Sequence, residues 1–325
     1  MSGLFEPVDE PAAETASAAA AKPRFRLNAA QVKALSARRD GPAVWRALAH
    51  IAVVAVCMAV AWNARGTWWA IPLVWVTGYP LVFMFNMVHE TAHQTAFRSR
   101  WLNYVFGQLA GFAIMLPYEY YRSFHWDHHR YTQQTGRDPE KTLSLPGSLP
   151  GYVVLMLGFP LWFKRSVPTL LRHAFGKAPE PWVTEERRPV IVREARLYLA
   201  GYLLIAAVSV WAGSWAALVV WLLPLAMGQM FMRPYLLSEH TGCAYSDNML
   251  ENTRTTYTNG FVRFFAWNMP YHAEHHLYPS VPFHALPALH ELTRDHLVVT
   301  ANGYFQAVAQ VYRYLVKGIP VRAVD

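Results

Sequence analysis

The sequence is poor in the residues that build disulfide-linked, thiolate-bound or strongly charged proteins. Only two of its 325 residues are cysteines, Cys57 inside an apolar run and Cys243 far from it. Two such residues exclude a disulfide framework and a four-thiolate zinc site, so any metal must be held by other side chains. Charged residues make up only 15% of the chain, and the net charge of +8 is not gathered in a basic stripe apart from apolar sequence. We therefore expect contact with anionic lipid headgroups and no nucleic-acid partner.

The N-terminal residues do not have the pattern of a secretory signal. Residues 1–23 are acidic and rich in alanine and proline, whereas a signal peptide has a basic region followed by an apolar one. Basic residues follow just before the first apolar run, as in a cytoplasmic flank. We expect residues 1–43 to form a disordered, basic N-terminal segment, residues 44–310 a single membrane domain, and residues 311–325 a C-terminal tail.

Apolar residues are abundant, at 54% of the chain, and they lie in long runs without formal charge. Residues 47–64 and 66–89 are two such runs, separated only by Arg65, and they predict two membrane helices joined by a short turn. A third run covers residues 197–232. As one helix it would be about 54 Å long, against a hydrocarbon core of about 30 Å, so we expect it to fold back at residues 212–214.

These runs predict an all-α integral membrane protein with four transmembrane helices in two hairpins and a cytoplasmic helical cap. Two further apolar stretches, residues 101–118 and 151–163, are ambiguous. We expect both to be re-entrant or interfacial, because a crossing at the first would put the histidines on its two sides in opposite compartments. The distribution of lysine and arginine then places both termini and the histidines on the cytoplasmic side of the inner, cytoplasmic membrane.

Nine of the fourteen histidines fall into four groups along the chain, three tight groups and the single His240. In three of the groups the histidines are separated by three or four residues, so on a helix their imidazoles project from one face and can bind one ion. His240 stands alone just after the fourth predicted span. The candidate metal ligands are His89, His93, His125, His128, His129, His240, His272, His275 and His276.

Nine imidazoles exceed the three or four ligands of a zinc site, so their number predicts two metal ions. Iron is the natural candidate, although the sequence does not exclude zinc or manganese. Glu90, Asp127, Glu239 and Glu274 are interleaved with the histidines. A helix turns such neighbours away from the metal, so we expect them to accept imidazole N–H groups or to face solvent. Asn268 lies four residues before His272 and can reach the site directly or through water. Among these polar residues near the expected ligands, our candidate catalytic residues are Asn268, Asp127 and Glu239.

Together, the order of the histidine groups and the apolar hairpins between them resemble the integral-membrane fatty acid desaturase and hydroxylase superfamily. The resemblance covers roughly residues 45–296. Finer strings are similar to its sphingolipid-desaturase-type branch: HETAHQTAF, FHWDHHRYTQ, LLSEH and NMPYHAEHHLYPSVP. The three tight histidine groups, which begin at His89, His125 and His272, correspond to the first, second and third histidine boxes of the superfamily. These boxes are specific for the superfamily and only weakly specific for the substrate or the product.

The resemblance implies a non-haem centre of two iron ions held by the nine histidines. Such a centre uses dioxygen and two electrons to attack an unactivated C–H bond of a fatty acyl or other lipid chain. Two features depart from part of the family: the third box begins with His272 and not glutamine, and no His-Pro-Gly-Gly haem-domain signature is present. The resemblance therefore implies a separate electron donor such as a ferredoxin.

Several alternatives remain open at this stage. The same site can serve a lipid or carotenoid hydroxylase or an oxidative decarboxylase. A membrane zinc hydrolase is more remote, although His89-Glu90-Thr91-Ala92-His93 matches the H-E-x-x-H motif literally. A metal transporter is remote as well, because it needs ionisable residues along its spans. The interior of the predicted spans holds only His50, and His89 is the last residue of the second run.

Overall fold

The computed structural model of the protein describes residues 25–142, 146–319 and 321. These residues form two compact units. The helical unit comprises residues 39–126 and 157–233, and the mixed unit comprises the described parts of residues 1–38, 127–156 and 234–325. The disordered tail expected at residues 1–23 lies outside the described residues.

The helical unit is built from long helices that are mostly apolar. In chain order they are α2 (Asp40–Asn63), α3 (Ala70–Phe83), α4 (Phe85–Ala92), α5 (Arg100–Ala113), the first turns of α6 (Tyr118–Tyr131), α8 (Phe159–Ala174), α9 (Arg188–Trp211), the π-helical turn η3 (Leu218–Leu222) and the first turns of α10 (Leu223–His240).

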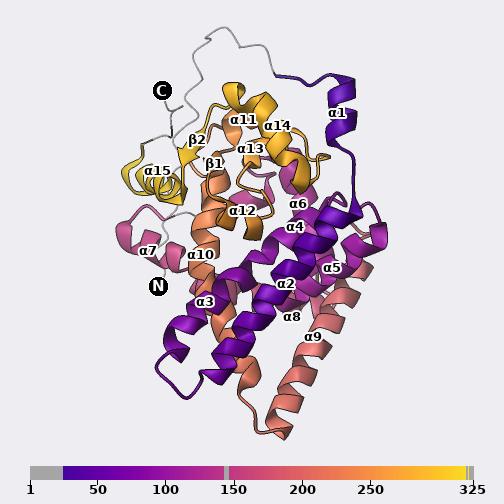
Figure 1. Ribbon diagram of the computed structural model, residues 1–325, viewed down its shortest axis with the longest axis vertical. Helices are drawn as coiled ribbons and strands as arrows, with labels where there is room; N and C mark the ends of the chain where they lie inside the picture. Colours follow the sequence, from indigo (N-terminus) through magenta and orange to yellow (C-terminus); the bar gives the residue numbers. More distant parts are fainter. Residues whose placement is uncertain (1–24, 143–145, 320, 322–325) are drawn as a thin grey trace. The chain divides into compact units, whose positions relative to one another are not determined.

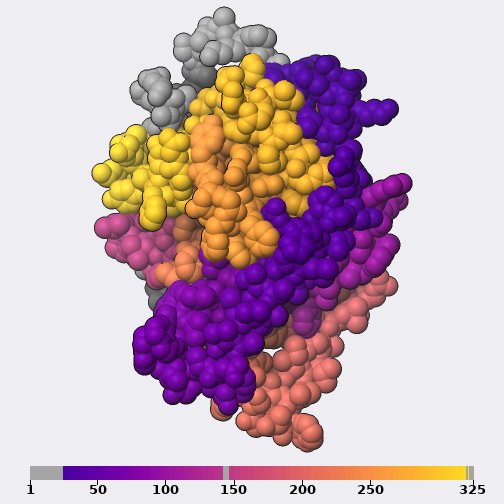
Figure 2. Space-filling view, viewed as in Figure 1, coloured from indigo at the N-terminus to yellow at the C-terminus, as the bar shows by residue number. Residues whose placement is uncertain are grey.

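Two helical segments are long and apolar enough to cross a membrane, as the first two charge-free runs predicted. They are α2, with 24 residues, and the 23-residue segment Ala70–Ala92 that contains α3 and α4. At 1.5 Å per residue each measures about 35 Å, which matches a hydrocarbon core of about 30 Å. Trp45, Val56 and Val60 on α2 are exposed, and Figure 2 shows this indigo helix on the surface of its unit. Exposed apolar side chains along a whole helix are typical of a lipid-facing surface.

The helices α2 and α3 form the predicted hairpin and lie side by side in Figure 1. Two polar contacts fix their register. The Nε2 atom of His50 on α2 lies 2.7 Å from the Pro80 carbonyl oxygen on α3, and the Thr77 hydroxyl donates to the Cys57 carbonyl at 3.3 Å. His50, the one histidine in the interior of the predicted spans, therefore has a structural partner.

The third apolar run folds back where the sequence predicts. The helix α9 ends at Trp211, and Gly213 follows with a φ of +57°, a left-handed conformation that glycine adopts without strain. The four-span arrangement is not confirmed, because among the described helices only the two segments above pass as membrane spans by length and composition. The first turns of α9 carry Arg193 and Glu194 and therefore shorten its apolar part.

The two ambiguous stretches form separate short helices. Residues 101–113 belong to α5, and residues 151–163 belong to α7 (Leu149–Leu157) and α8. The break between α7 and α8 falls at Gly158, whose φ is +73° and whose added Cβ would lie 2.7 Å from the Gln229 carbonyl oxygen. A side chain at this position would be both strained and crowded.

The mixed unit consists of short elements. They are α1 (Ala29–Leu35), the 3-10 helix η2 (Pro139–Thr142), α7, α11 (Met249–Asn252), β1 (Thr255–Tyr257), α12 (Gly260–Phe265), α13 (His272–Leu277), η4 (Phe283–Ala285), α14 (Leu286–Thr293), η5 (Arg294–His296), β2 (Thr300–Asn302) and α15 (Tyr304–Lys317).

A small parallel sheet in this unit corrects the all-α expectation. Strands β1 and β2 pair with Thr255 opposite Thr300 and Tyr257 opposite Asn302. Strands of three residues, separated by more than forty positions, have no hydrophobic period that a sequence reveals. The helix α13 packs against β1 and α14. The helix α15 continues past residue 310, where we placed the end of the membrane domain, and it buries Val311 and Leu315.

Candidate metal centre

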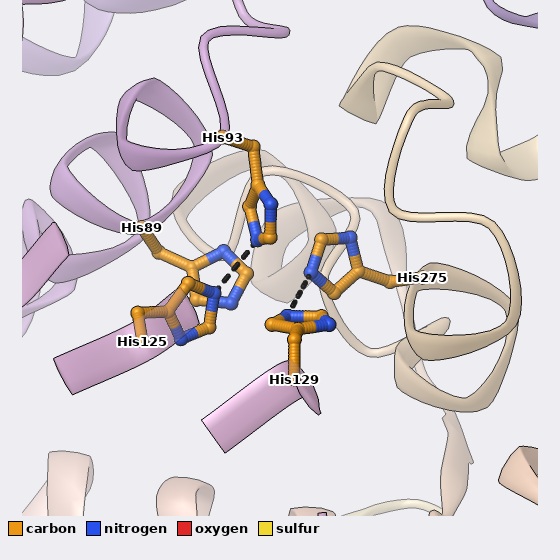
Figure 3. A group of neighbouring side chains, drawn as sticks. All are labelled: His89, His93, His125, His129 and His275. Carbon is orange, nitrogen blue, oxygen red and sulfur yellow. Dashed lines mark hydrogen bonds between the residues drawn. The ribbon is translucent and has the colours of Figure 1, made fainter. Parts of the chain in front are cut away.

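The first set of histidines lies in the helical unit, on α4 and α6. His89 is in the last turn of α4 and His93 caps its C-terminus, so both imidazoles leave one face of the helix. His125 of α6 faces them: its Nε2 atom lies 2.7 Å from that of His93, and its ring centroid is 4.2 Å from that of His89 (Figure 3). All three side chains are buried. The structure thus brings the first histidine of the second box to the first box.

The helix α6 continues with His128 and His129, three and four residues after His125, on the same helical face. Asp127, which lies between His125 and His128 in the sequence, points away from these imidazoles. Its carboxylate accepts a hydrogen bond from the exposed Arg130 guanidinium at 3.2 Å. The helical periodicity therefore separates the imidazoles from this candidate catalytic carboxylate.

The second set lies in the mixed unit and brings together three segments distant in sequence. The Nε2 atom of His240, at the end of α10, lies 3.1 Å from that of His128 and 3.2 Å from that of His272. The ring of His276 is centred 4.6 Å from the rings of both His240 and His272. A separate pair faces each other in Figure 3, with 3.1 Å between the Nε2 atoms of His129 and His275. The isolated His240 therefore belongs with the boxes in space.

These nitrogens fit a metal ion. Two imidazoles bound at about 2.1 Å and at angles of 90–109° hold their nitrogens about 3.0–3.4 Å apart, which matches the 3.1 and 3.2 Å separations. The Nδ1 atom of His276 lies 3.2 Å from the Thr132 hydroxyl, while its buried Nε2 atom has no hydrogen-bond partner among the described residues. Burial and the neighbouring imidazoles hold the pKa of His276 well below its usual value. The ring is thus neutral, with a lone pair available for a metal.

Asp138 orients His128, a contact that our sequence analysis missed. Its Oδ1 atom lies 2.9 Å from Nδ1 of His128, and its other oxygen accepts the Gln133 backbone N–H at 2.8 Å. Burial opposes ionisation of Asp138, but the hydrogen bond from His128 and the backbone donors lower its pKa. The carboxylate is therefore charged, and it directs the Nε2 lone pair of His128 toward His240. The only sequence signal was an aspartate before a proline, ten residues after the histidine.

Replacing Asp138 with asparagine is expected to weaken metal binding about 10- to 100-fold, because the imidazole loses its charged acceptor. Equilibrium dialysis against chelator-buffered Fe(II), followed by elemental analysis, measures the change. Asp127→Asn is the matched control. Among the described residues its carboxylate forms a hydrogen bond with exposed Arg130 and none with a histidine. This substitution should therefore leave the affinity for Fe(II) unchanged. Equal losses in the two variants would contradict the assignment.

The other interleaved carboxylates and Asn268 have distinct surroundings. Glu274 is fully buried on α13 and accepts hydrogen bonds from the His290 imidazole and the Thr255 hydroxyl, which tie α13 to α14 and β1. An oxygen of Glu239 lies 3.5 Å from Nδ1 of His272. Asn268 donates its side-chain amide to the Phe283 carbonyl at 2.9 Å. Asn268 is thus engaged with a loop, and Glu239 is the candidate catalytic residue that lies beside a ligand. In the helical unit, Glu90 accepts a hydrogen bond from Thr95.

Comparisons of the sequence with known proteins identify a family. A family model described as fatty acid desaturase matches residues 66–306. The sn-1 oleoyl-lipid 12-desaturase of Picosynechococcus is 26% identical over 262 residues, covering 74% of this chain and 73% of the relative. The sphingolipid delta(4)-desaturase/C4-monooxygenase of Mus musculus is 24% identical over 261 residues, covering 75% and 72%. An sn-1 acyl-lipid omega-3 desaturase (ferredoxin) of Nostoc is 28% identical over 127 residues, covering 36% and 35%. The chain is an oxidoreductase that belongs to the fatty acid desaturase family.

Proposed function

We propose that this oxidoreductase is a membrane-bound lipid desaturase with two iron ions. It removes two hydrogens from neighbouring carbons of an aliphatic chain, and these hydrogens, with two electrons and two protons, reduce one dioxygen to two waters. The observation that carries the proposal is the set of buried and, at His129, half-buried imidazoles whose nitrogens face one another at metal-ligand spacing. The relatives that this chain resembles are named as lipid desaturases.

The nine histidines are the proposed ligands, and their number favours two ions over the single ion of a zinc hydrolase. Bound iron supplies the redox chemistry with dioxygen. The protein contributes neutral imidazoles, as at His276, and buried acceptors such as Asp138 that fix the ring orientation. Eight of the nine proposed ligands, all except His129, are buried, and their burial keeps bulk water away from them.

The proposed substrate is a fatty acyl or sphingoid chain of a membrane lipid. The names of the relatives specify oleoyl lipids, acyl lipids and sphingolipids, and the apolar, exposed α2 is suited to contact with lipid. We propose a location in the inner membrane with both termini on the cytoplasmic side, on the basis of the basic flank before α2. A separate electron donor, such as the ferredoxin named for the Nostoc relative, completes the proposal.

Hydroxylation of the same chain is the second candidate function. It is favoured by the name of the mouse relative, which combines a desaturase with a C4-monooxygenase. The two outcomes share the removal of the first hydrogen and differ afterwards: desaturation removes a second hydrogen from the next carbon, and hydroxylation places an oxygen atom on the first.

The products distinguish these functions directly. We expect cells that express the protein to contain a new lipid lighter than its precursor by two hydrogens, detected by mass spectrometry of the extracted lipids. Cells that express His128→Ala should lack this lipid. A product heavier than its precursor by one oxygen atom would support the hydroxylase instead, and an unchanged lipid profile in several hosts would contradict both.

A further inference from the structure

The last turn of α10 ends at His240 and has an unusual arrangement of hydrogen bonds. A helix leaves its last four carbonyl groups without helical donors. Here the backbone N–H of Thr241 donates to Leu237, and that of Cys243 donates to His240. The other two carbonyls accept hydrogen bonds from Arg254. Its backbone N–H donates to the Glu239 carbonyl at 2.8 Å, and its guanidinium donates to the Ser238 carbonyl. One residue therefore closes half of the helix terminus.

Arg254 is only 1% exposed. Its remaining donors reach the Thr241 carbonyl at 2.9 Å and the side-chain oxygen of Gln310 at 2.8 Å. No carboxylate of the described chain forms an ion pair with this guanidinium. A buried cation is costly unless its surroundings compensate it, and here the compensation comes from carbonyl groups at the negative end of the α10 dipole. The buried charge of Arg254 therefore lies at the C-terminal end of α10, the helix end that carries His240.

The segment before Arg254 orients the imidazole itself. The Asn252 carbonyl oxygen lies 3.2 Å from Nδ1 of His240, and the backbone N–H of Thr255 donates to Val299 at 3.1 Å. A carbonyl accepts only from a protonated Nδ1, so the lone pair of His240 is on Nε2. That atom faces the Nε2 atoms of His128 and His272 at 3.1 and 3.2 Å. The box histidines share short helices with other ligands, whereas His240 is the single candidate ligand on α10. Gln133 holds its backbone carbonyl at 2.6 Å, and the Asn252 carbonyl contacts its imidazole.

We propose that Arg254 is a positioning residue for His240. Its backbone and guanidinium clamp the last turn of α10 to the segment of residues 252–254, so that Nε2 of His240 points to the metal position shared with His128 and His272. The inference rests on the metal centre of the proposed function. It assigns to this arginine no contact with substrate or metal.

The test is metal binding by detergent-purified full-length protein, with Fe(II) titrated without oxygen and Co(II) as a spectroscopic probe. Arg254→Met removes the guanidinium at similar length. We expect the affinity of one of the two metal sites to fall about 10- to 100-fold, with a changed Co(II) ligand-field spectrum, while the other site is unaffected. Arg254→Lys keeps the positive charge, so its metal affinity should lie between those of the wild type and Arg254→Met. If Arg254→Met does not fold, the test is made with Arg254→Lys. The control is Arg294→Met, an exposed arginine paired with exposed Glu291.

The same titration in a His240→Ala background separates positioning from general stability. If Arg254 acts through His240, adding Arg254→Met should weaken metal binding no further. The inference is overturned if the single variants bind both metals as the wild type does, if both sites weaken equally, or if the double variant is weaker than His240→Ala alone. These outcomes leave the proposed function intact. A wild-type protein that binds no metal would overturn the proposed function and this inference together.

Discussion

His276→Ala is expected to lose one of two bound metal ions and all detectable lipid desaturation. The Nε2 atom of His276 is buried, is without a hydrogen-bond partner among the described residues, and belongs to a neutral ring. Loss of a supporting partner of a ligand already costs about 10- to 100-fold in metal affinity, so loss of the ligand itself should cost more. Elemental analysis of purified protein and lipid profiling measure the two effects.

The matched control for this variant is His296→Ala. His296 is exposed in η5, and its ring centroid lies 4.7 Å from that of Phe25. It is not among the described histidines that could hold a metal. Its replacement should leave metal content and product unchanged. A His276→Ala protein that keeps two metals and wild-type activity would remove this residue from the centre.

Gly228→Ala is expected to destabilise the helical unit by about 2–3 kcal/mol, a cost typical of overpacking. Gly228 on α10 faces Gly78 on α3. An added Cβ would lie 2.6 Å from the Gly78 carbonyl oxygen and 2.6 Å from a methyl carbon of Val82. One of these two atoms is a backbone oxygen, which cannot rotate away as a side chain can. The helices α3 and α10 must therefore separate to admit the Cβ. The midpoint of thermal unfolding in detergent should fall.

Gly41→Ala provides the same chemical change without the contact. Gly41 is in the first turn of α2, and a Cβ there would meet no atom within 4 Å. Its replacement should be neutral or raise the unfolding midpoint slightly, because alanine favours helix over glycine. Equal midpoints for Gly228→Ala and the wild type would mean that the two glycines are not packed against each other.

Local patterns predicted the parts of the fold that local forces determine. The two membrane-length helices and the turn at Gly213 follow from charge-free runs and from the special conformation of glycine. Their number was harder to predict, since Arg193 and Glu194 fall inside α9 and reduce its apolar length. The charge-free part of α9, residues 197–211, is therefore shorter than the roughly 20 residues that a membrane-spanning helix needs.

The histidine boxes were visible for the same reason. Spacings of three and four residues mark one face of a helix, and the structure places the box imidazoles in facing sets. The groups that orient them were not visible. The pairings of Asp138 with His128 and of His290 with Glu274 join segments whose relation appears only in the folded chain. Asp138 and His290 belong to none of the four histidine groups, so the sequence alone assigned them no role at the site.

Arg254 shows the same limit most clearly. In the sequence it is one basic residue among many beside apolar segments, where lysine and arginine commonly meet lipid phosphates. In the structure it is buried against the end of α10. The difference arises because β1 and β2 pair across a long stretch of chain and carry the arginine inward.

The most direct test of the central claim is the metal content of the purified wild-type protein, measured by elemental mass spectrometry. Nine histidines in a desaturase-family chain predict close to two irons per chain. One zinc per chain, with no iron after reconstitution under reducing conditions, would contradict the two-iron centre and favour a hydrolase.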